Sequence, residues 1–371
     1  MPDEAKFGTF FLPGPTEVRR EVLAAMMGPM IGHRGAAFEQ LYHRVQDGLR
    51  EVFRTARPVY VSTSSATGFM EAGVRNAPPG PVLAVVNGAF SERFADIARS
   101  CGRDVTVLAV PWGEVAAPDA VRAHLTTGRF AAVTVVHSET STGALTDIAA
   151  ITREAREHGT LCLVDSVTGL GAAPVETDGW ELDFLLTGSQ KALALPPGLA
   201  FAVASERYLA GVSQAEARGR YFDIEEFERY AARDQTPNTP AVSLLYALDV
   251  QLAAIMREGM AGRWTRHGAM ADRTHAWVAE TAAATGLDLG ILAAEGSRSP
   301  TVTAVTVPAG ITGNDVVRAV AARGFVIGDG YGTVRERTFR IGHMGDHTVA
   351  GLESCLAACA DALDTLARGG S

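Results

Sequence analysis

The segment Thr187-Gly-Ser-Gln-Lys-Ala-Leu-Ala-Leu-Pro-Pro-Gly198 places a lysine in a small, polar turn directly after a short apolar run, Phe184–Leu186. Most lysines are solvated surface residues without a special role. At the end of a buried strand, however, desolvation and neighbouring charges lower the pKa of a lysine, and the neutral amine can then form an imine. Lys191 is therefore a candidate catalytic residue at the end of a core strand.

Short apolar runs on both sides of this segment alternate with helix-like stretches, between about residues 58 and 205. Apolar residues at helical spacing separate the runs. Continuous apolar strands separated by helices predict a mainly parallel sheet with helices on both faces, and ligands of such sheets bind at the carboxyl ends of the strands. Seven strands are predicted, at Val59–Ser62, Val82–Val86, Val105–Val110, Ala131–Val136, Leu161–Val164, Phe184–Leu186 and Ala200–Ala204, with helices at Gly68–Asn76, Ser91–Ser100, Ala117–Leu125 and Ile148–His158.

The sequence outside this core divides into further parts. We expect residues 1–57 to form an N-terminal arm with a helix, residues 58–245 a large domain, and residues 246–371 a connecting helix and a small C-terminal α+β domain. One long helical stretch is predicted over Val242–Thr285. Strands at Thr301–Val307, Phe325–Ile327 and Thr338–Ile341 and helices at Ala37–Phe53, Asn314–Arg323 and Val349–Leu366 complete the prediction.

Composition and charge exclude several classes of protein. The net charge of -9 argues against a nucleic-acid partner, because a phosphate backbone must be met by a basic face. The cysteines Cys101, Cys162, Cys355 and Cys359 lack metal-ligand spacing, so no metal site is expected. The stretch Met1–Thr9 lacks the pattern of a signal peptide, and no apolar run reaches the ~18 residues of a membrane span. We therefore expect a cytoplasmic protein that does not contact membranes.

Two other predicted strands also end in polar residues. Asp165 follows the apolar run Leu161–Val164, where an acid is costly unless it is paired. The protonated ring nitrogen of pyridoxal 5'-phosphate (PLP) is one such partner, whereas capping of the next segment is the alternative. Val61-Ser-Thr-Ser-Ser-Ala-Thr-Gly68 leads from a strand into a helix, whose free N–H groups can bind a phosphate. Ordinary helix capping by serine and threonine is the alternative for this segment.

The segment around Lys191, with Ser-Gln before it and Pro-Pro-Gly after it, resembles the class V aminotransferases of PLP fold type I. Within them, the chain resembles the alanine/serine–glyoxylate (or pyruvate) aminotransferase group. Four further motifs match in the family's order, and the resemblance covers nearly the whole chain. They are Pro13-Gly-Pro-Thr16, Asn87-Gly-Ala-Phe-Ser-Glu-Arg93, His137-Ser-Glu-Thr-Ser-Thr-Gly143 and Phe339-Arg-Ile-Gly342.

The resemblance implies a role for each matched residue. Lys191 would carry PLP as a Schiff base and shuttle protons, Asp165 would hold the ring nitrogen, and Arg340 would bind the substrate α-carboxylate through its planar fork. Thr236 would reach the phosphate of the neighbouring subunit, which makes a homodimer with shared active sites. Of the remaining cofactor contacts, the resemblance implies phosphate binding by Ser65, Ala66, Thr67 and Gln190, ring packing by Phe90 and Val167, and a position near the ring hydroxyl for Thr140.

Simpler explanations exist for three of these residues. Phe90 fits an ordinary core phenylalanine and Thr140 a buried turn threonine, while Arg340 taken alone fits a surface ion pair. The matched Phe-Arg-Ile-Gly context favours the substrate role for Arg340.

The resemblance implies a transaminase that moves the amino group of alanine or serine to glyoxylate or pyruvate by ping-pong kinetics. Phosphoserine:2-oxoglutarate transamination is the main alternative, because several cations were candidates for binding an anionic side group: His33, Arg34, Arg233, His343 and His347. A cysteine desulfurase needs a mobile cysteine in a loop, which no cysteine fits. A non-catalytic subunit of the same fold would have lost Lys191, Asp165 or Arg340, and all three are present.

Overall fold

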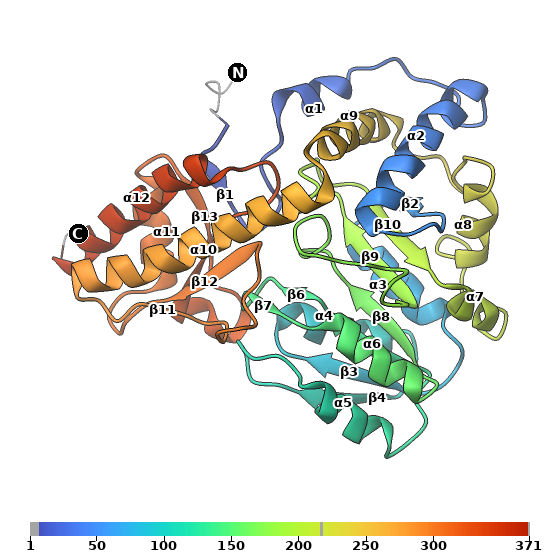
Figure 1. Cartoon of the computed structure of the whole chain (residues 1–371), viewed down its shortest axis with the longest axis horizontal. Coiled ribbons are helices and arrows are strands. Elements are labelled where there is room, and N and C mark those ends of the chain that lie inside the picture. The colour runs from blue at the N-terminus through green and yellow to red at the C-terminus, as the bar shows by residue number, and fades with distance from the viewer. Residues whose placement is uncertain (1–6, 216–217, 370–371) are drawn as a thin grey trace.

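The computed structural model describes residues 7–215 and 218–369. Residues 1–6, part of the stretch in which no signal peptide was expected, lie outside the described residues. Figure 1 shows a large α/β part and a smaller part built on a second sheet, with helix α10 (Met260–Thr285) running from the junction across the smaller part.

The larger part is built on a seven-stranded sheet in the order β2-β10-β9-β8-β5-β3-β4. Its strands β9, β8, β5, β3 and β4 run parallel, whereas β10 is antiparallel to both of its neighbours. The predicted mainly parallel sheet of seven strands is therefore confirmed. The strands are β2 (Tyr60–Ser62), β3 (Val82–Val86), β4 (Val105–Ala109), β5 (Ala132–Val136), β8 (Leu161–Asp165), β9 (Phe184–Gly188) and β10 (Ala200–Ala204).

Helices cover both faces of this sheet because six of its seven strands, all except edge strand β4, consist of buried residues. Side chains that alternate along the strands enter two separate cores. One face packs against α3 (Ala66–Asn76), α4 (Ala89–Ser100), α7 (Glu206–Val212) and α8 (Ile224–Ala231), and the other against α2 (Ala36–Phe53), α5 (Pro118–Leu125), α6 (Ile148–Glu157) and α9 (Val242–Glu258).

The smaller part has a five-stranded sheet in the order β1-β13-β14-β12-β11, packed against α10, α11 (Gly313–Ala321) and α12 (Val349–Ala367). Strand β1, Phe10–Phe11, pairs in parallel with β13, so the N-terminal arm begins in the C-terminal sheet. The sequence analysis did not predict this pairing. The other strands are β11 (Gly290–Ile291), β12 (Val302–Thr306), β13 (Val326–Asp329) and β14 (Thr338–Gly342), with the 3-10 helix η1 (Gly332–Arg337) before β14.

The prediction of one helical stretch over Val242–Thr285 was wrong in one respect. The structure has two helices, α9 and α10, separated at Gly259. Gly259 has φ 74°, a left-handed conformation that glycine adopts without steric cost and that ends a right-handed helix. The break turns the chain between the two parts of the molecule.

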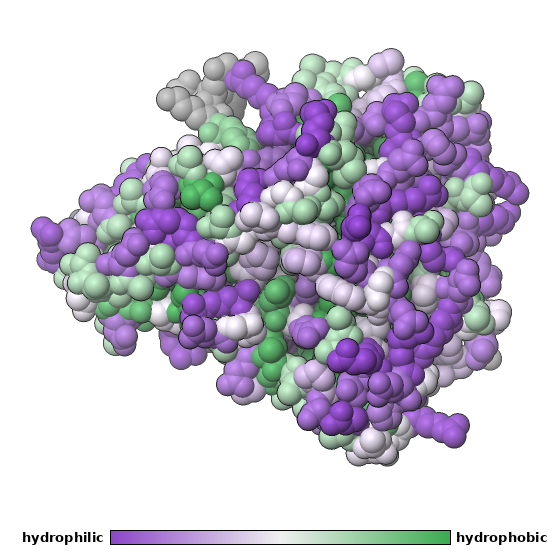
Figure 2. Space-filling view, viewed as in Figure 1, coloured by the Kyte–Doolittle hydropathy of each residue, from purple (hydrophilic) through white to green (hydrophobic). Residues whose placement is uncertain are grey.

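The view in Figure 2 shows a largely hydrophilic face, with hydrophobic residues in small groups rather than in one continuous patch. None of the helices in residues 7–215 and 218–369 is both long and apolar enough to cross a bilayer. Within the same residues, no group of three or more acidic, histidine or cysteine side chains is arranged to hold a metal ion.

Candidate active site

A cavity of about 190 Å³ lies at the carboxyl ends of the central strands. Its lining contains nine of the ten residues that the sequence analysis assigned to the cofactor, brought together from the loops after β2, β3, β5, β8 and β9. These nine are Ser65, Ala66, Thr67, Phe90, Thr140, Asp165, Val167, Gln190 and Lys191. Thr236 is the exception and lies in a separate small pocket with Ser62 and Pro237.

The start of α3 forms one end of the cavity. Ser65 is the N-cap residue, with extended backbone, and the helix begins at Ala66, two residues before the predicted start. The first N–H groups of a helix have no partner within the helix, and its dipole favours negative charge at this end. Ser65, Ala66 and Thr67 therefore present donors that suit a phosphate group.

Asp165 is the last residue of β8 and is 3% exposed. Its carboxylate accepts a hydrogen bond from Val167 N at 2.8 Å. Burial raises the pKa of Asp165 to about 7, and Glu139 adds to the rise, while the Val167 N–H and Lys191 oppose it. A buried acid with this pKa is stabilised in its ionised form by a cationic partner, which a protonated pyridine nitrogen would supply.

Lys191 lies in the turn after β9 and is 7% exposed. Its Nζ donates a hydrogen bond to Pro13 O and lies 5.9 Å from the centre of the Phe90 ring. Burial and the nearby Arg340 lower the pKa of Lys191 to about 8, although Asp165 and Glu139 oppose this change. At pH 7 about a tenth of the amine is therefore neutral, and thus nucleophilic, far more than for an ordinary lysine.

The N-terminal arm packs directly against this lysine. A Cβ atom at Gly14 would lie 2.5 Å from Cδ and Nζ of Lys191. Gly14 also has φ 110°, a conformation that favours glycine. The Pro13–Thr16 motif thus brings main chain, without a side chain, up to the reactive amine.

Phe90 stands in the first turn of α4, where its ring is shared between the two cavities of the site. The guanidinium of Arg93 lies 4.8 Å from the ring centre, and Tyr331 stacks on the ring at 5.7 Å between centroids. Phe90 is therefore a wall of the site rather than an ordinary core phenylalanine. Sequence analysis gave Tyr331 no role.

A second cavity, of about 410 Å³, adjoins the first and contains Arg340. Lys191, Phe90 and Thr140 line both cavities. Arg340 is 7% exposed, and its Nε and Nη1 donate to the main-chain oxygens of Asp329 (2.7 Å) and Thr140 (3.1 Å). Burial lowers its pKa, while Asp329 opposes the change. These bonds orient the guanidinium toward the cavity and exclude a solvated surface position for Arg340.

Glu139 organises the wall between the cavities, and sequence analysis gave it no role. Its buried carboxylate accepts hydrogen bonds from the main-chain N–H groups of Phe90, Ser91 and Ser141 and from both serine hydroxyls. It thereby caps α4 and joins Phe90 to the loop that contains Thr140. An acid among hydroxyl residues in His137–Gly143 was the available signal, but the sequence does not show which donors converge on it.

The expected cations for an anionic substrate group do not line either cavity. His343 is fully buried between Thr303 Oγ1 and Pro300 O, and burial lowers its pKa to about 3. His347 bonds to Phe10 O, and burial lowers its pKa to about 4. Arg34 donates to the main-chain oxygens of Thr236 and Pro237. Among the described residues, Arg233 and His33 are likewise outside the cavity linings. Within one chain, the structure therefore gives no support to the hypothesis that these side chains bind an anionic substrate group.

The doubly covered sheet, the strand-end lysine and the buried aspartate together define an enzyme of PLP fold type I. The family profile described as "Aminotransferase class-V" matches residues 10–344. The chain belongs to this family of aminotransferases, and membership implies PLP as the cofactor.

Characterised relatives share most of their length with the chain. L-aspartate–glyoxylate aminotransferase from Paracoccus denitrificans is 36% identical over 92% of this chain and 87% of its own. Serine–glyoxylate aminotransferase from Methylorubrum extorquens is 33% identical over 91% and 86%. The crystal structure of alanine–glyoxylate aminotransferase from Nostoc sp. superimposes with a TM-score of 0.91 at 32% identity, covering 98% of this chain and 97% of that one.

Proposed function

We propose that this enzyme transfers the amino group of a small L-amino acid, alanine or serine, to glyoxylate or pyruvate. The observation that supports it best is the position of Lys191, which lines one cavity together with Asp165 and the adjoining cavity together with Arg340. A cofactor ring in the first cavity and a substrate carboxylate in the second would thus meet at the same amine.

The residues of the first cavity fit PLP. Asp165 offers the buried carboxylate for the ring nitrogen, the start of α3 offers N–H donors for the phosphate, and Phe90 and Val167 offer apolar surfaces for the ring. Lys191 Nζ is the amine that would hold the cofactor aldehyde. When bound, PLP supplies the electron sink for the bond that breaks at the substrate α-carbon.

The side chains of the chain perform the remaining steps. Arg340 holds the substrate α-carboxylate with the N–H groups that do not bond to the main-chain oxygens of Asp329 and Thr140, including Nη2, which lies 3.8 Å from the Asp329 carboxylate. Lys191, once its amine is free, removes the proton from the substrate α-carbon and carries it to its new position at the cofactor. The first product leaves before the second substrate binds, so the two half-reactions use the same groups in opposite directions.

Alanine and serine are proposed as donors, and glyoxylate as the first acceptor to test. The relatives from Paracoccus and Methylorubrum and the Nostoc structure are all named as glyoxylate aminotransferases. Leu12, Phe90 and Tyr331 contribute apolar and aromatic surface to the substrate cavity, which suits a small side chain.

The test is the visible absorption spectrum of the purified protein, followed by separate additions of L-alanine, L-serine, L-aspartate and L-phosphoserine. A yellow band that bleaches with alanine or serine and returns with glyoxylate supports the proposal. Bleaching by phosphoserine alone would contradict the proposed donors, and a protein that stays colourless after incubation with PLP would refute the cofactor.

The phosphoserine alternative has little support. A phosphoserine aminotransferase structure from Cytophaga hutchinsonii is 21% identical, which shows a shared fold alone. In the substrate cavity, Arg335 is paired with Asp329 at 3.0 Å, closer than Arg340, which lies 3.8 Å from the same carboxylate.

We also propose that the enzyme is a cytoplasmic homodimer with shared active sites. Thr236 lies outside the cofactor cavity of its own chain, which agrees with a contact to the neighbouring subunit. Within the chain, its hydroxyl donates to Asn238 O at 2.8 Å. Mixing Lys191→Ala subunits with Thr236→Ala subunits tests this arrangement. Shared sites predict recovered activity, because one site of each hybrid is intact, whereas independent sites predict at most the sum of the two variants.

A further inference from the structure

Arg263, in the first turn of α10, is a guanidinium that the proposed chemistry does not use. It is 1% exposed although it carries a full charge. Burying a guanidinium costs several kcal/mol unless all its donors are matched. The partners of the guanidinium therefore indicate the role of Arg263.

Two of its partners are main-chain oxygens next to the reactive groups. Nη2 donates to Ala192 O at 2.5 Å, and Ala192 directly follows Lys191. Nε donates to Gly171 O at 3.1 Å, in the turn after β8, the strand that ends in Asp165. A single side chain thus binds the segments that follow β8 and β9, the strands that lead to Asp165 and Lys191.

The other partners belong to the smaller part of the molecule and to the α9–α10 junction. Nη1 donates to Glu258 Oε2 at 2.9 Å and to Asp346 Oδ1 at 3.1 Å. Asp346 lies four residues after β14, the strand that contains Arg340. Arg263 is therefore bonded to segments that follow the strands of Asp165, Lys191 and Arg340.

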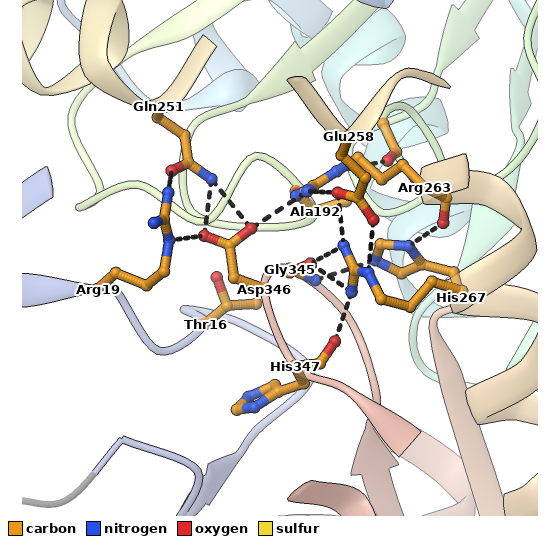
Figure 3. Close-up of polar contacts among 12 residues, drawn as sticks. Thr16, Arg19, Ala192, Gln251, Glu258, Arg263, His267, Gly345, Asp346 and His347 are labelled. Atoms are coloured by element: carbon orange, nitrogen blue, oxygen red, sulfur yellow. Dashed lines mark hydrogen bonds and ion pairs between the residues drawn. The ribbon is translucent and has the colours of Figure 1, made fainter. Parts of the chain in front are cut away.

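Asp346 links this cluster to the N-terminal arm, as Figure 3 shows. Arg19 Nε donates to Asp346 Oδ2 at 2.6 Å, and Gln251 Nε2 donates to the same carboxylate. The pKa of Asp346 is lowered: burial opposes the change, but Arg263, Gln251 and Arg19 outweigh it. The carboxylate is therefore ionised at neutral pH and can bridge the two arginines.

The arm also bonds to the lysine turn itself. Thr16 Oγ1 donates to Lys191 O at 3.0 Å, and Thr16 N donates to Gln190 O at 3.0 Å. Three successive carbonyl groups of the turn, those of residues 190–192, thus accept hydrogen bonds from Thr16 or Arg263.

We propose that Arg263 is a positioning residue for the reaction, which holds the main chain of the Lys191 turn in a fixed place relative to the strand of Arg340. The inference rests on the proposed role of Lys191. The planar fork of arginine reaches two carbonyl groups and two carboxylates at once, whereas the single ammonium of lysine cannot. Arg263→Lys keeps the charge and removes this geometry.

The control is Arg273→Lys, on the same helix. Arg273 bonds to Glu280 and to Glu353 on α12, and among the described residues it makes no hydrogen bond to Gly171, Ala192 or Asp346. Both substitutions keep the charge and remove an arginine fork from α10, so Arg273→Lys shows what the loss of such a fork does without the bonds to Gly171 and Ala192.

The experiment uses the full-length holoenzyme and two readouts. Hydrogen–deuterium exchange measures opening at Ala194 and Leu195, whose N–H groups bond to Lys191 O and Ser189 O inside the turn. Loss of one charge-assisted hydrogen bond predicts about tenfold faster exchange there in Arg263→Lys. The second readout is the pH at which the absorption band of the bound cofactor changes, which should move in Arg263→Lys and stay in place in Arg273→Lys.

Several outcomes would contradict the inference. The inference is refuted if Arg263→Lys has a lower melting temperature but the same exchange rates and the same pH of the absorption change as wild type. It is also refuted if Arg273→Lys changes both readouts as much as Arg263→Lys does. If Arg263→Lys does not fold, Asp346→Asn replaces it, and a smaller change of the same kind supports the inference while none refutes it. A wild-type protein without a cofactor band would instead refute the proposed function.

Discussion

Asp165→Asn tests the electrostatics of the site in the cofactor-free protein. The substitution keeps the size of the side chain and an oxygen that can accept the hydrogen bond from Val167 N. Burial raises the pKa of Asp165 from 3.8 to about 7 in the folded chain. Between these two pH values the folded protein keeps a proton that the unfolded chain has released, so stability falls as the pH rises.

The magnitude follows from the size of this window. Each pH unit costs about 1.4 kcal/mol, and from pH 5 to pH 8, through the folded pKa near 7, the wild type loses about 3 kcal/mol relative to Asp165→Asn. Above about pH 8 the difference stays constant. Urea denaturation of both proteins at pH 5, 6, 7 and 8 measures it, with Asp96→Asn, exposed on α4, as a control. Parallel stability curves for wild type and Asp165→Asn would refute the reasoning.

Three further substitutions probe the walls of the site. Gly14→Ala places a Cβ 2.5 Å from the Lys191 side chain, so we expect the cofactor band to be lost or shifted; an unchanged spectrum would show that the arm gives way. Glu139→Gln leaves at least one buried N–H or O–H donor without an acceptor, and we expect the free energy of unfolding to fall by about 1–3 kcal/mol and PLP to bind more weakly in spectral titrations. Equal PLP affinity would show that Glu139 is only structural. Arg340→Lys loses the planar fork, and we expect KM for the amino donor to rise about tenfold or more in steady-state assays, which a KM equal to wild type would contradict.

The sheet could be predicted because six of its seven strands are buried on both faces and therefore consist of nearly continuous apolar residues. Val82–Val86 and Ala200–Ala204 have the same bounds in sequence and structure. Helix α8 was missed, because its apolar positions, such as Ile224 and Phe227, lie among charged residues that hide their spacing. The starts of α3 and α4 were each placed two residues late, since Ser65 and Gly88 carry little hydrophobic signal.

The part of the site that could be predicted consists of residues whose type and position in the sequence already indicate their chemistry. A lysine at a strand end is rare enough to be recognised, and its motif gave the neighbouring residues by resemblance. Glu139, Tyr331 and Arg263 depend instead on what the fold brings near them. Their partners lie up to hundreds of residues away, as in the bond between Arg93 and Tyr331, so no local pattern identifies them.

Strand β1 also affects the order in which the protein can be completed during synthesis. Phe10–Phe11 pair with Val326–Ile327, so this ladder cannot form until most of the chain has left the ribosome. Gly14 and Thr16 follow immediately and reach the lysine turn from that anchored strand. A nascent chain that stops before residue 326 has the lysine and the aspartate but lacks the fixed arm across them. The site around Lys191 is therefore completed late in folding, only after strand β13 has formed and paired with β1.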